Sequence, residues 1–337
     1  MLKNKDLRMF QPNLFRYATT ELSQDAIICY ILEWAKVENK VNNENLHNLA
    51  IEFIDSLFDK FSIIPKPTNY TKIEIKKQYK KIDILCIIND EYSIIIEDKT
   101  NTKNHSDQLK RYKIQIKEDL PKTQILPIYF KTGDQSDYND VIKNGYKVYL
   151  RQDFLEVLNT YSTDNNIIDD YKNYLQNIED SINSYKILPI NQWHWDSWKG
   201  FFIELRKKLN DGNWDYISNP NGGFLGFWWN WNNNKEYHIY LQINHSISKI
   251  TFKLYTKTSA KIEKSIINKW KKDIVHNDDD IIINKPRVVR SGKSVTIGIL
   301  ENEFRQTNND NIIDMDETIK FIKKIEDIKL DKFKGLK

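Results

Sequence analysis

The chain has 337 residues, a length that suggests two domains, and its 29% charged and 40% hydrophobic residues are typical of a globular protein rather than a disordered one. No stretch reaches the roughly 18 apolar residues of a membrane helix, so no membrane partner and a cytoplasmic location are expected. Residues 1–180 hold 25 basic and 28 acidic residues, a net charge of −3, whereas residues 181–337 hold 26 and 19, a net charge of +7. The C-terminal half therefore has either a polyanionic partner or a solvated basic surface.

The N-terminal half is predicted to have the order α-α-β-β-β-α-β-β-α. A helix should begin near Thr20, with Thr19 or Thr20 as its cap, and apolar residues spaced i, i+3, i+4 and i+7 from Leu46 to Phe58 indicate a second helix. Strands are expected at 72–79, 82–88, 92–98, 123–130 and 146–150. Further helices are expected after Asn104, as the N-cap, to about Glu118, and over 151–160. The second and third strands are almost continuously apolar, which indicates a sheet covered on both faces.

Residues 160–190, mostly polar and ending at Pro189, are the expected linker to a second, α+β domain over 190–337. In that domain helices are predicted near 192–209, 259–273 and 315–326, and strands near 224–231, 237–243, 249–256, 282–288 and 294–299. Strand alternation would place Phe227, Trp229 and Trp231 on one face. That face is either core or a surface that stacks unpaired bases.

The stretch KIDILCIINDEYSIIIEDKT carries charged residues at the outer ends of two apolar strands. If residues 89–91 form the loop of a hairpin, Ile88 pairs with Tyr92 and Asp83 lies directly opposite Glu97. Facing residues have Cβ atoms about 5 Å apart, so two acids there destabilise the pair unless a cation neutralises them. Mg²⁺, which prefers carboxylate oxygens and keeps several waters, is a suitable cation.

Lys99 extends this group, because side chains alternate along a strand. Lys99 shares a face with Glu97, while Asp98 points to the other face. An amine beside a metal can orient or deprotonate water, or stabilise charge on a phosphate, so the three groups suit phosphodiester hydrolysis. The alternative is that the acids form ordinary diagonal salt bridges with Lys81 and Lys99.

This arrangement resembles the PD-(D/E)XK nuclease superfamily, and the α-β-β-β-α-β order over residues 20–130 is similar to the core of its restriction-endonuclease-like fold. Gln108 and Tyr112, four residues apart and so on one helix face, resemble the Gln-x-x-x-Tyr element of one large branch. Glu21 resembles a first-helix glutamate that adds a metal ligand in many members. The chain departs from the motif at Ile82, where the family has proline.

The resemblance implies an α/β catalytic domain over 1–165 with a mixed central sheet flanked by helices. The implied ligands of Mg²⁺ or Mn²⁺ are Glu21, Asp83, Glu97 and the carbonyl of Asp98. The implied assisting residues are Lys99, which positions water, and Gln108 and Tyr112, which contact phosphate or orient the strand.

The expected function is metal-dependent hydrolysis of nucleic acid, of DNA rather than RNA, in defence against foreign DNA. The alternative is a catalytically silent nucleic-acid-binding or regulatory protein that keeps the fold. In the nuclease interpretation, the C-terminal domain recognises substrate, a protein partner or a second copy of the chain.

Overall fold

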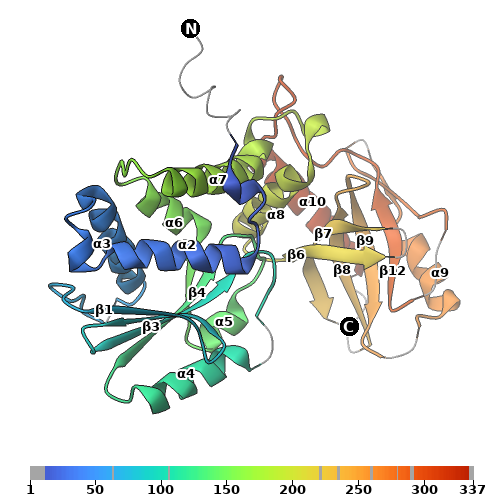
Figure 1. Ribbon diagram of the computed structural model, residues 1–337. Coiled ribbons are helices and arrows are strands. Elements are labelled where there is room, and N and C mark those ends of the chain that lie inside the picture. The colour runs from blue at the N-terminus through green and yellow to red at the C-terminus, as the bar shows by residue number, and fades with distance from the viewer. Residues whose placement is uncertain are drawn as a thin grey trace, which may run out of the picture. The chain divides into compact units, whose positions relative to one another are not determined.

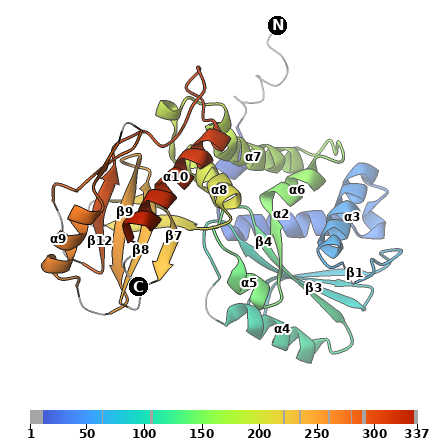
Figure 2. The same ribbon diagram turned by 180° about the vertical axis from the view of Figure 1, so that it is seen from behind.

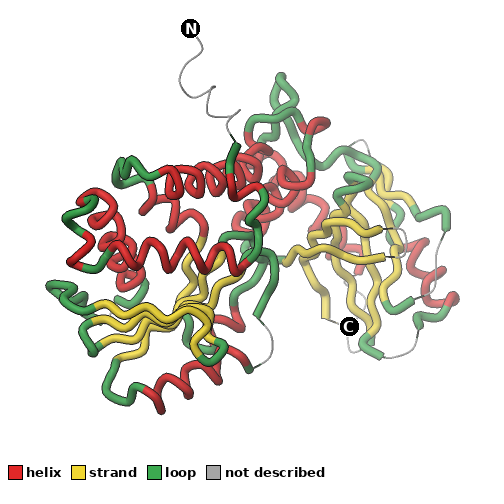
Figure 3. Tube along the Cα trace, viewed as in Figure 1, coloured by secondary structure: helices red, strands yellow, loops and turns green. Residues whose placement is uncertain are grey.

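The computed structural model describes residues 12–62, 64–104, 107–219, 222–233, 236–258, 261–278, 280–288 and 292–333. The chain forms two compact units, the first ending at Glu179 and the second beginning at Asp180 (Figure 1). Both units combine helices with a β-sheet, as Figure 3 shows. Within the described residues, no helix has the length and apolar content needed to cross a membrane.

The first unit opens with helices α2 (Glu21–Trp34) and α3 (Glu44–Asp59), each preceded by a short 3₁₀ turn, at Leu14–Arg16 and Val37–Asn39. The Thr20 side chain accepts a hydrogen bond from the backbone N–H of Ser23, and Asn43 does the same for Leu46. Each cap satisfies an N–H group that has no partner inside its helix. The predicted start of the first helix is therefore explained by Thr20.

The sheet of the first unit has the order β1-β2-β3-β4-β5. Its strands are Ile73–Tyr79, Ile82–Ile88, Tyr92–Lys99, Gln124–Lys131 and Lys147–Leu150. β1, β2 and β3 are antiparallel, whereas β3, β4 and β5 are parallel, so the sheet is mixed. The predicted hairpin register is confirmed, since Ile88 pairs with Tyr92 and Ile84 with Ile96, which makes Asp83 and Glu97 the next facing positions.

Helices cover both faces of this sheet (Figures 1 and 2). On one face α2, α3, α6 (Arg151–Leu158) and α7 (Asn166–Asn183) share a core with β2, β3 and β4. On the other, α4 (Gln108–Asp119) and α5 (Asn139–Lys143) pack against the alternate residues of the same strands. Burial on both sides is the reason that β2 and β3 are almost continuously apolar.

The first unit differs from the sequence-based expectation in three respects. α4 begins at Gln108, with Asp107 in the N-cap position instead of the predicted Asn104, whose side chain donates to an aspartate of α5. The five-residue helix α5 was not expected, because it is too short to show a period. α7 buries Ile168 and Tyr171 in the first core, so much of the segment 160–190 is part of the first unit instead of a linker.

The second unit contains an antiparallel sheet with the order β10-β11-β12-β9-β8-β7-β6. In chain order β6 to β12 are Asn213–Asn219, Gly222–Asn233, Tyr237–Asn244, Lys249–Thr256, His276–Asn277, Ile282–Asn284 and Ser294–Leu300. The helices are α8 (Trp195–Leu209), α9 (Lys264–Asp273) and α10 (Met315–Phe333), with 3₁₀ turns at Ser184–Lys186 and Ile190–Gln192. The strands β6 and β10 were not expected, and β11 stops at Asn284, short of the predicted 282–288.

A bulge in β7 makes the predicted orientation of Trp231 wrong. The pairing with β8 shifts register after Trp229, and Asn230 has a φ of 55°. Phe227 and Trp229 are fully buried in the core, whereas Trp231 stacks on Tyr240 on the opposite face. The inserted residue reverses the alternation, so the side chains beyond it change sides.

Candidate active site

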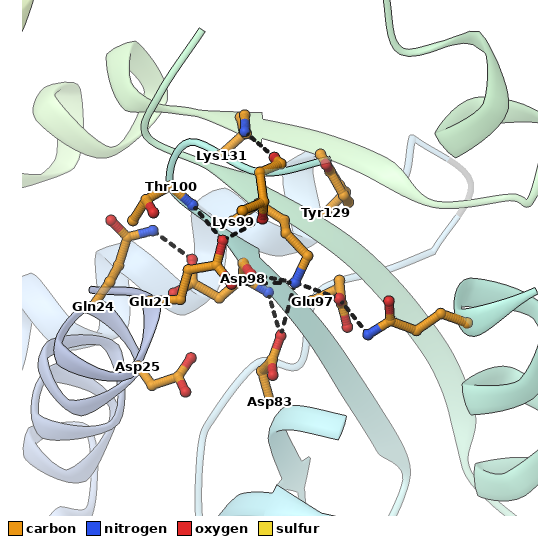
Figure 4. A network of polar contacts seen from close by, with 12 residues as sticks. Glu21, Gln24, Asp25, Asp83, Glu97, Asp98, Lys99, Thr100, Tyr129 and Lys131 are labelled. Atoms are coloured by element: carbon orange, nitrogen blue, oxygen red, sulfur yellow. Dashed lines mark hydrogen bonds and ion pairs between the residues drawn. The ribbon is translucent and has the colours of Figure 1, made fainter. Parts of the chain in front are cut away.

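Side chains of α2, β2 and β3 converge at one end of the β2–β3 hairpin (Figure 4). The Lys99 Nζ atom lies 2.6 Å from Glu97 Oε1, and 3.7 Å from both Asp83 Oδ2 and Glu21 Oε2. It also donates a hydrogen bond of 2.8 Å to the carbonyl oxygen of Asp98. One ammonium group therefore lies within reach of all four groups that the resemblance implies as metal ligands.

The two facing acids of the hairpin are held in an unfavourable environment. Asp83 Oδ2 accepts a hydrogen bond of 2.9 Å from the backbone N–H of Asp98, which ties the ends of β2 and β3 together. Glu97 is fully buried, and its Oε2 atom has no hydrogen-bond partner among the described residues. Burial, followed by the negative charge of Asp83, raises the pKa of Glu97 to about 7. The two acids therefore need positive charge nearby to stabilise their ionised forms.

Lys99 supplies part of that charge. Burial by itself lowers the pKa of its ammonium group, but Glu97, Asp83 and Glu21 together raise the pKa above its usual value. Lys99 is therefore charged at neutral pH, and it compensates acids that would otherwise repel one another.

The arrangement fits a divalent cation. The positively charged Lys99 ammonium lies among the carboxylate and carbonyl oxygen atoms of the site. The buried Oε2 atom of Glu97 has no hydrogen-bond donor among the described residues. Carboxylate and carbonyl oxygens are the ligands that Mg²⁺ and Mn²⁺ prefer. Within the described part of the chain, no three His, Cys, Asp or Glu side chains gather closely enough to hold a metal as they stand. A metal would therefore have to displace the ammonium from between the acids.

Gln108 and Tyr112 of α4 are joined to this site through Glu97. The Nε2 atom of Gln108 donates to Glu97 Oε1 at 2.8 Å and to Tyr112 Oη at 2.9 Å. The expectation that these two side chains share a helix face holds. Gln108 contacts the carboxylate directly, and Tyr112 contacts Gln108. They orient Glu97 from the side opposite α2.

The Asp98 side chain points to the other face of β3, toward α2. Its Oδ1 atom accepts a hydrogen bond from Gln24 Nε2, and Gln24 Oε1 accepts from the hydroxyls of Thr132 and Tyr171. Burial raises the pKa of Asp98 well above its usual range. This buried network links β3 to α2, α7 and the end of β4, and the sequence analysis did not find it.

Asp25 is a further acid that the sequence analysis missed. It is buried, and its Oδ2 atom accepts a hydrogen bond of 3.2 Å from Gln78, which also donates to Asp83. Burial, followed by the charge of Asp83, raises the pKa of Asp25 to about 6. A signal existed, because Asp25 follows Glu21 by four residues and so lies on the same helix face.

Lys131 is a second buried lysine near the site. It is the partner of Lys99 in the β3–β4 register, and its ammonium group donates to the carbonyl of Thr102. Burial lowers its pKa to about 8. No motif marks Lys131 in the sequence, since only the parallel pairing of β3 with β4 places it beside Lys99.

The thermal stability of the metal-free protein should depend on pH through Glu97. The pKa of Glu97 is about 7 in the folded state against 4.5 ordinarily, so the folded state holds the extra proton between these values and loses stability as pH rises through them. Above pH 7, a divalent ion held by Glu97 would take the place of that proton. We therefore expect Mg²⁺ to raise the melting temperature more at pH 8 than at pH 6.

Scanning calorimetry at both pH values, with Mg²⁺ or EDTA, checks this expectation. Glu97→Gln should melt higher than wild type at pH 8 in EDTA and should respond little to Mg²⁺. Glu91→Gln, in the exposed hairpin loop, is the matched control and should behave as wild type. An equal Mg²⁺ response in Glu97→Gln would contradict the assignment of Glu97 as a ligand.

Comparison with known proteins identifies a family for this chain. A family model described as the PD-(D/E)XK nuclease superfamily matches residues 13–188, just over half of the chain. No curated protein and no solved structure gives a significant match. The matched range contains every residue of the site described above.

Proposed function

The chain belongs to the PD-(D/E)XK nuclease superfamily, and we propose that its first unit cleaves DNA with a metal held by Glu21, Asp83, Glu97 and the Asp98 carbonyl. Membership implies a nuclease, whereas the substrate, the choice of Mg²⁺ or Mn²⁺ and the ligand set are our proposals. The observation that supports the ligand set is the common position of the Lys99 ammonium, no more than 3.7 Å from an oxygen of each group. The choice of DNA rests on the family resemblance.

A divalent ion bound there would supply positive charge for the scissile phosphate and a water of lowered pKa. Lys99 would add a second positive charge, which favours the transition state because charge on the phosphate oxygens increases there. Its ammonium could also donate a hydrogen bond to the attacking water. Gln108 keeps the Glu97 carboxylate in place, and the Tyr112 hydroxyl fixes the Gln108 amide.

The proposal is tested by incubating the full-length protein with supercoiled plasmid, linear duplex, single-stranded DNA and RNA. Each substrate is given Mg²⁺, Mn²⁺ or EDTA, and the products are resolved on gels. We expect cleavage of DNA with either metal and none with EDTA. Cleavage of RNA alone would overturn the choice of substrate, and cleavage that survives EDTA would overturn the metal site.

Gln108→Leu should weaken the apparent Mg²⁺ affinity or the cleavage rate about 10- to 100-fold, as is usual when a hydrogen bond to a metal ligand is lost. Tyr112→Phe should have a smaller effect, because it removes only the group that orients Gln108. The measurement is the initial cleavage rate as a function of Mg²⁺ concentration. Gln115→Leu, farther along α4 and bonded to Asp119, is the control, and an effect of Gln108→Leu no larger than its effect would contradict the role.

At the cellular level, we propose that the protein acts in the cytoplasm in defence against foreign DNA. This proposal rests on the family resemblance. Bacterial cells that express the wild-type protein should yield fewer bacteriophage plaques than cells that express Asp83→Asn. Equal plaque counts at equal protein levels would reject that role while leaving the biochemical proposal intact.

A further inference from the structure

One face of the sheet of the second unit lies away from the core cluster that the described residues form. Phe227 and Trp229 lie on the side covered by α8 and α10, which Figures 1 and 2 show on one side of the strands. The register of β8 with β9 pairs His238 with Tyr255 and Tyr240 with Lys253 on the opposite side. We call this opposite side the aromatic face; its members are Trp228, Trp231, His238, Tyr240, Lys253 and Tyr255.

Trp231 is a supported aromatic platform on this face. Its ring stacks on that of Tyr240, with centroids 4.1 Å apart and planes 14° apart, and Tyr255 meets it edge-on at 6.0 Å. It nevertheless keeps 40% of its surface exposed. The β7 bulge places Trp231 here instead of in the core. A partly exposed indole held rigid from behind is suited to stacking an unpaired base.

Lys253 gives the aromatic face an uncompensated positive charge. Its ammonium donates to the Thr296 hydroxyl at 3.0 Å, and no carboxylate in the described part of the chain lies within ion-pair distance. The strands β8, β9 and β12 together contain two lysines and no acid. Burying an ammonium without a counter-ion is costly, so the favourable occupant beside it is an anion.

Two buried polar atoms next to the indoles also lack partners among the described residues. They are His238 Nδ1, in a side chain that is 95% buried, and Asn213 Oδ1, in the residue paired with Trp228. The His238 ring lies 6.0 Å from that of Trp231. A ligand with a flat ring and polar groups along the edge of that ring could form hydrogen bonds with such atoms.

We propose that the aromatic face of the second unit binds single-stranded nucleic acid, with a base stacked on Trp231 and a phosphate at Lys253. A base, its polar edge and a phosphate match the indole, the unpartnered atoms and the ammonium, and the net charge of +7 over residues 181–337 favours a polyanion. The inference extends the proposed nuclease function by naming the strand that the second unit holds. It is testable without cleavage.

The test is fluorescence anisotropy of the full-length protein in EDTA with a labelled oligothymidylate, and with an abasic strand and a duplex of the same length. Trp231→Ala should weaken binding of the oligothymidylate about tenfold, and Trp231→Phe should restore most of it. Lys253→Met, which keeps the packing of the stem, should weaken binding and reduce the slope of log K against log salt by about 0.7. The abasic strand and the duplex should bind more weakly than the oligothymidylate.

Matched controls are Trp195→Ala, whose side chain is 39% exposed and packs near Tyr216 and His245, and Lys207→Met in α8. Both should bind as wild type does, and circular dichroism verifies that every variant is folded. Equal binding of abasic strand and oligothymidylate, or unchanged binding by folded Trp231→Ala, overturns the proposal. Sedimentation gives a further test. If the wild-type protein is a dimer that Trp231→Ala dissociates without loss of nucleic-acid binding, the aromatic face is an interface between copies, and the proposal is overturned.

The outcomes separate this inference from the nuclease proposal. Metal-dependent cleavage together with unaffected binding by Trp231→Ala would overturn the inference alone. A stacking-dependent affinity in a protein that cleaves no substrate would support the inference and reject the proposed function. Free thymidine monophosphate can be tested as a competitor of the labelled oligothymidylate. If it competes as well per nucleotide as unlabelled oligothymidylate does, the aromatic face binds a mononucleotide, and the choice of a strand is overturned.

Discussion

Asp83→Asn is expected to reduce metal-dependent DNA cleavage by on the order of 10³-fold, the largest effect of any single substitution in this chain. Asparagine has the shape of aspartate, and its carbonyl can still accept the hydrogen bond that Asp83 receives from the Asp98 backbone. The variant therefore keeps the link between β2 and β3 and loses one negative charge beside Glu97. Initial rates measured over a range of Mg²⁺ concentrations check the prediction.

Asp90→Asn is the matched control, because Asp90 belongs to the same hairpin and forms an exposed ion pair with Lys72. Its cleavage rate should equal that of the wild type, since an exposed pair of this kind contributes little. Asp83→Asn should also be more stable than wild type in EDTA at pH 8, because Glu97 no longer faces a second acid. Cleavage by Asp83→Asn within a few-fold of the wild-type rate would show that this acid is not part of the active site.

Lys99→Met should lower the cleavage rate by about 10²- to 10³-fold, because it removes the positive charge that lies nearest to all the proposed ligands. Methionine fills the space of the lysine stem, so the packing at the end of β3 is kept. The metal-free variant should be less stable than wild type at pH 8, because Glu21, Asp83 and Glu97 lose their compensating ammonium.

Calorimetric titration with Mn²⁺ separates a catalytic Lys99 from a structural one. Lys99→Met should bind the metal as tightly as the wild type or more tightly, because the ammonium no longer competes for the acids, while its cleavage remains poor. Lys81→Met, an exposed lysine directly before β2, is the control and should match wild type in both measurements. If Lys99→Met loses metal binding and cleavage together, the lysine only shapes the ligand set.

The N-terminal helices, the strands of the first sheet and the hairpin that carries the site could be predicted from local pattern. Residues 82–88 form β2 as expected, and β3 extends the expected strand by one residue, to Lys99. Strand alternation and a loop of three residues are enough to make Asp83 and Glu97 face each other, because the period of a strand is two residues. The helical period likewise placed Gln108 and Tyr112 on one face.

Other parts of the site depend on contacts between segments far apart in the chain. Gln24 joins Asp98 to Tyr171 of α7, and Lys131 reaches the site only because β4 lies beside β3. In the second unit, one left-handed residue, Asn230, accompanies the bulge that moves Trp231 out of the core. Hydropathy periods do not encode such contacts.

By itself, the sequence determined which residues share a strand face or a helix face, because a local period sets the direction of each side chain. It therefore determined the pair of acids and the lysine that follows them. Only the tertiary structure decided which faces meet. It brought Glu21 of α2 to Lys99 and Gln108 of α4 to Glu97, and it stacked Trp231 on Tyr240. Those meetings depend on packing and hydrogen bonding across the whole unit, which no short window of sequence contains.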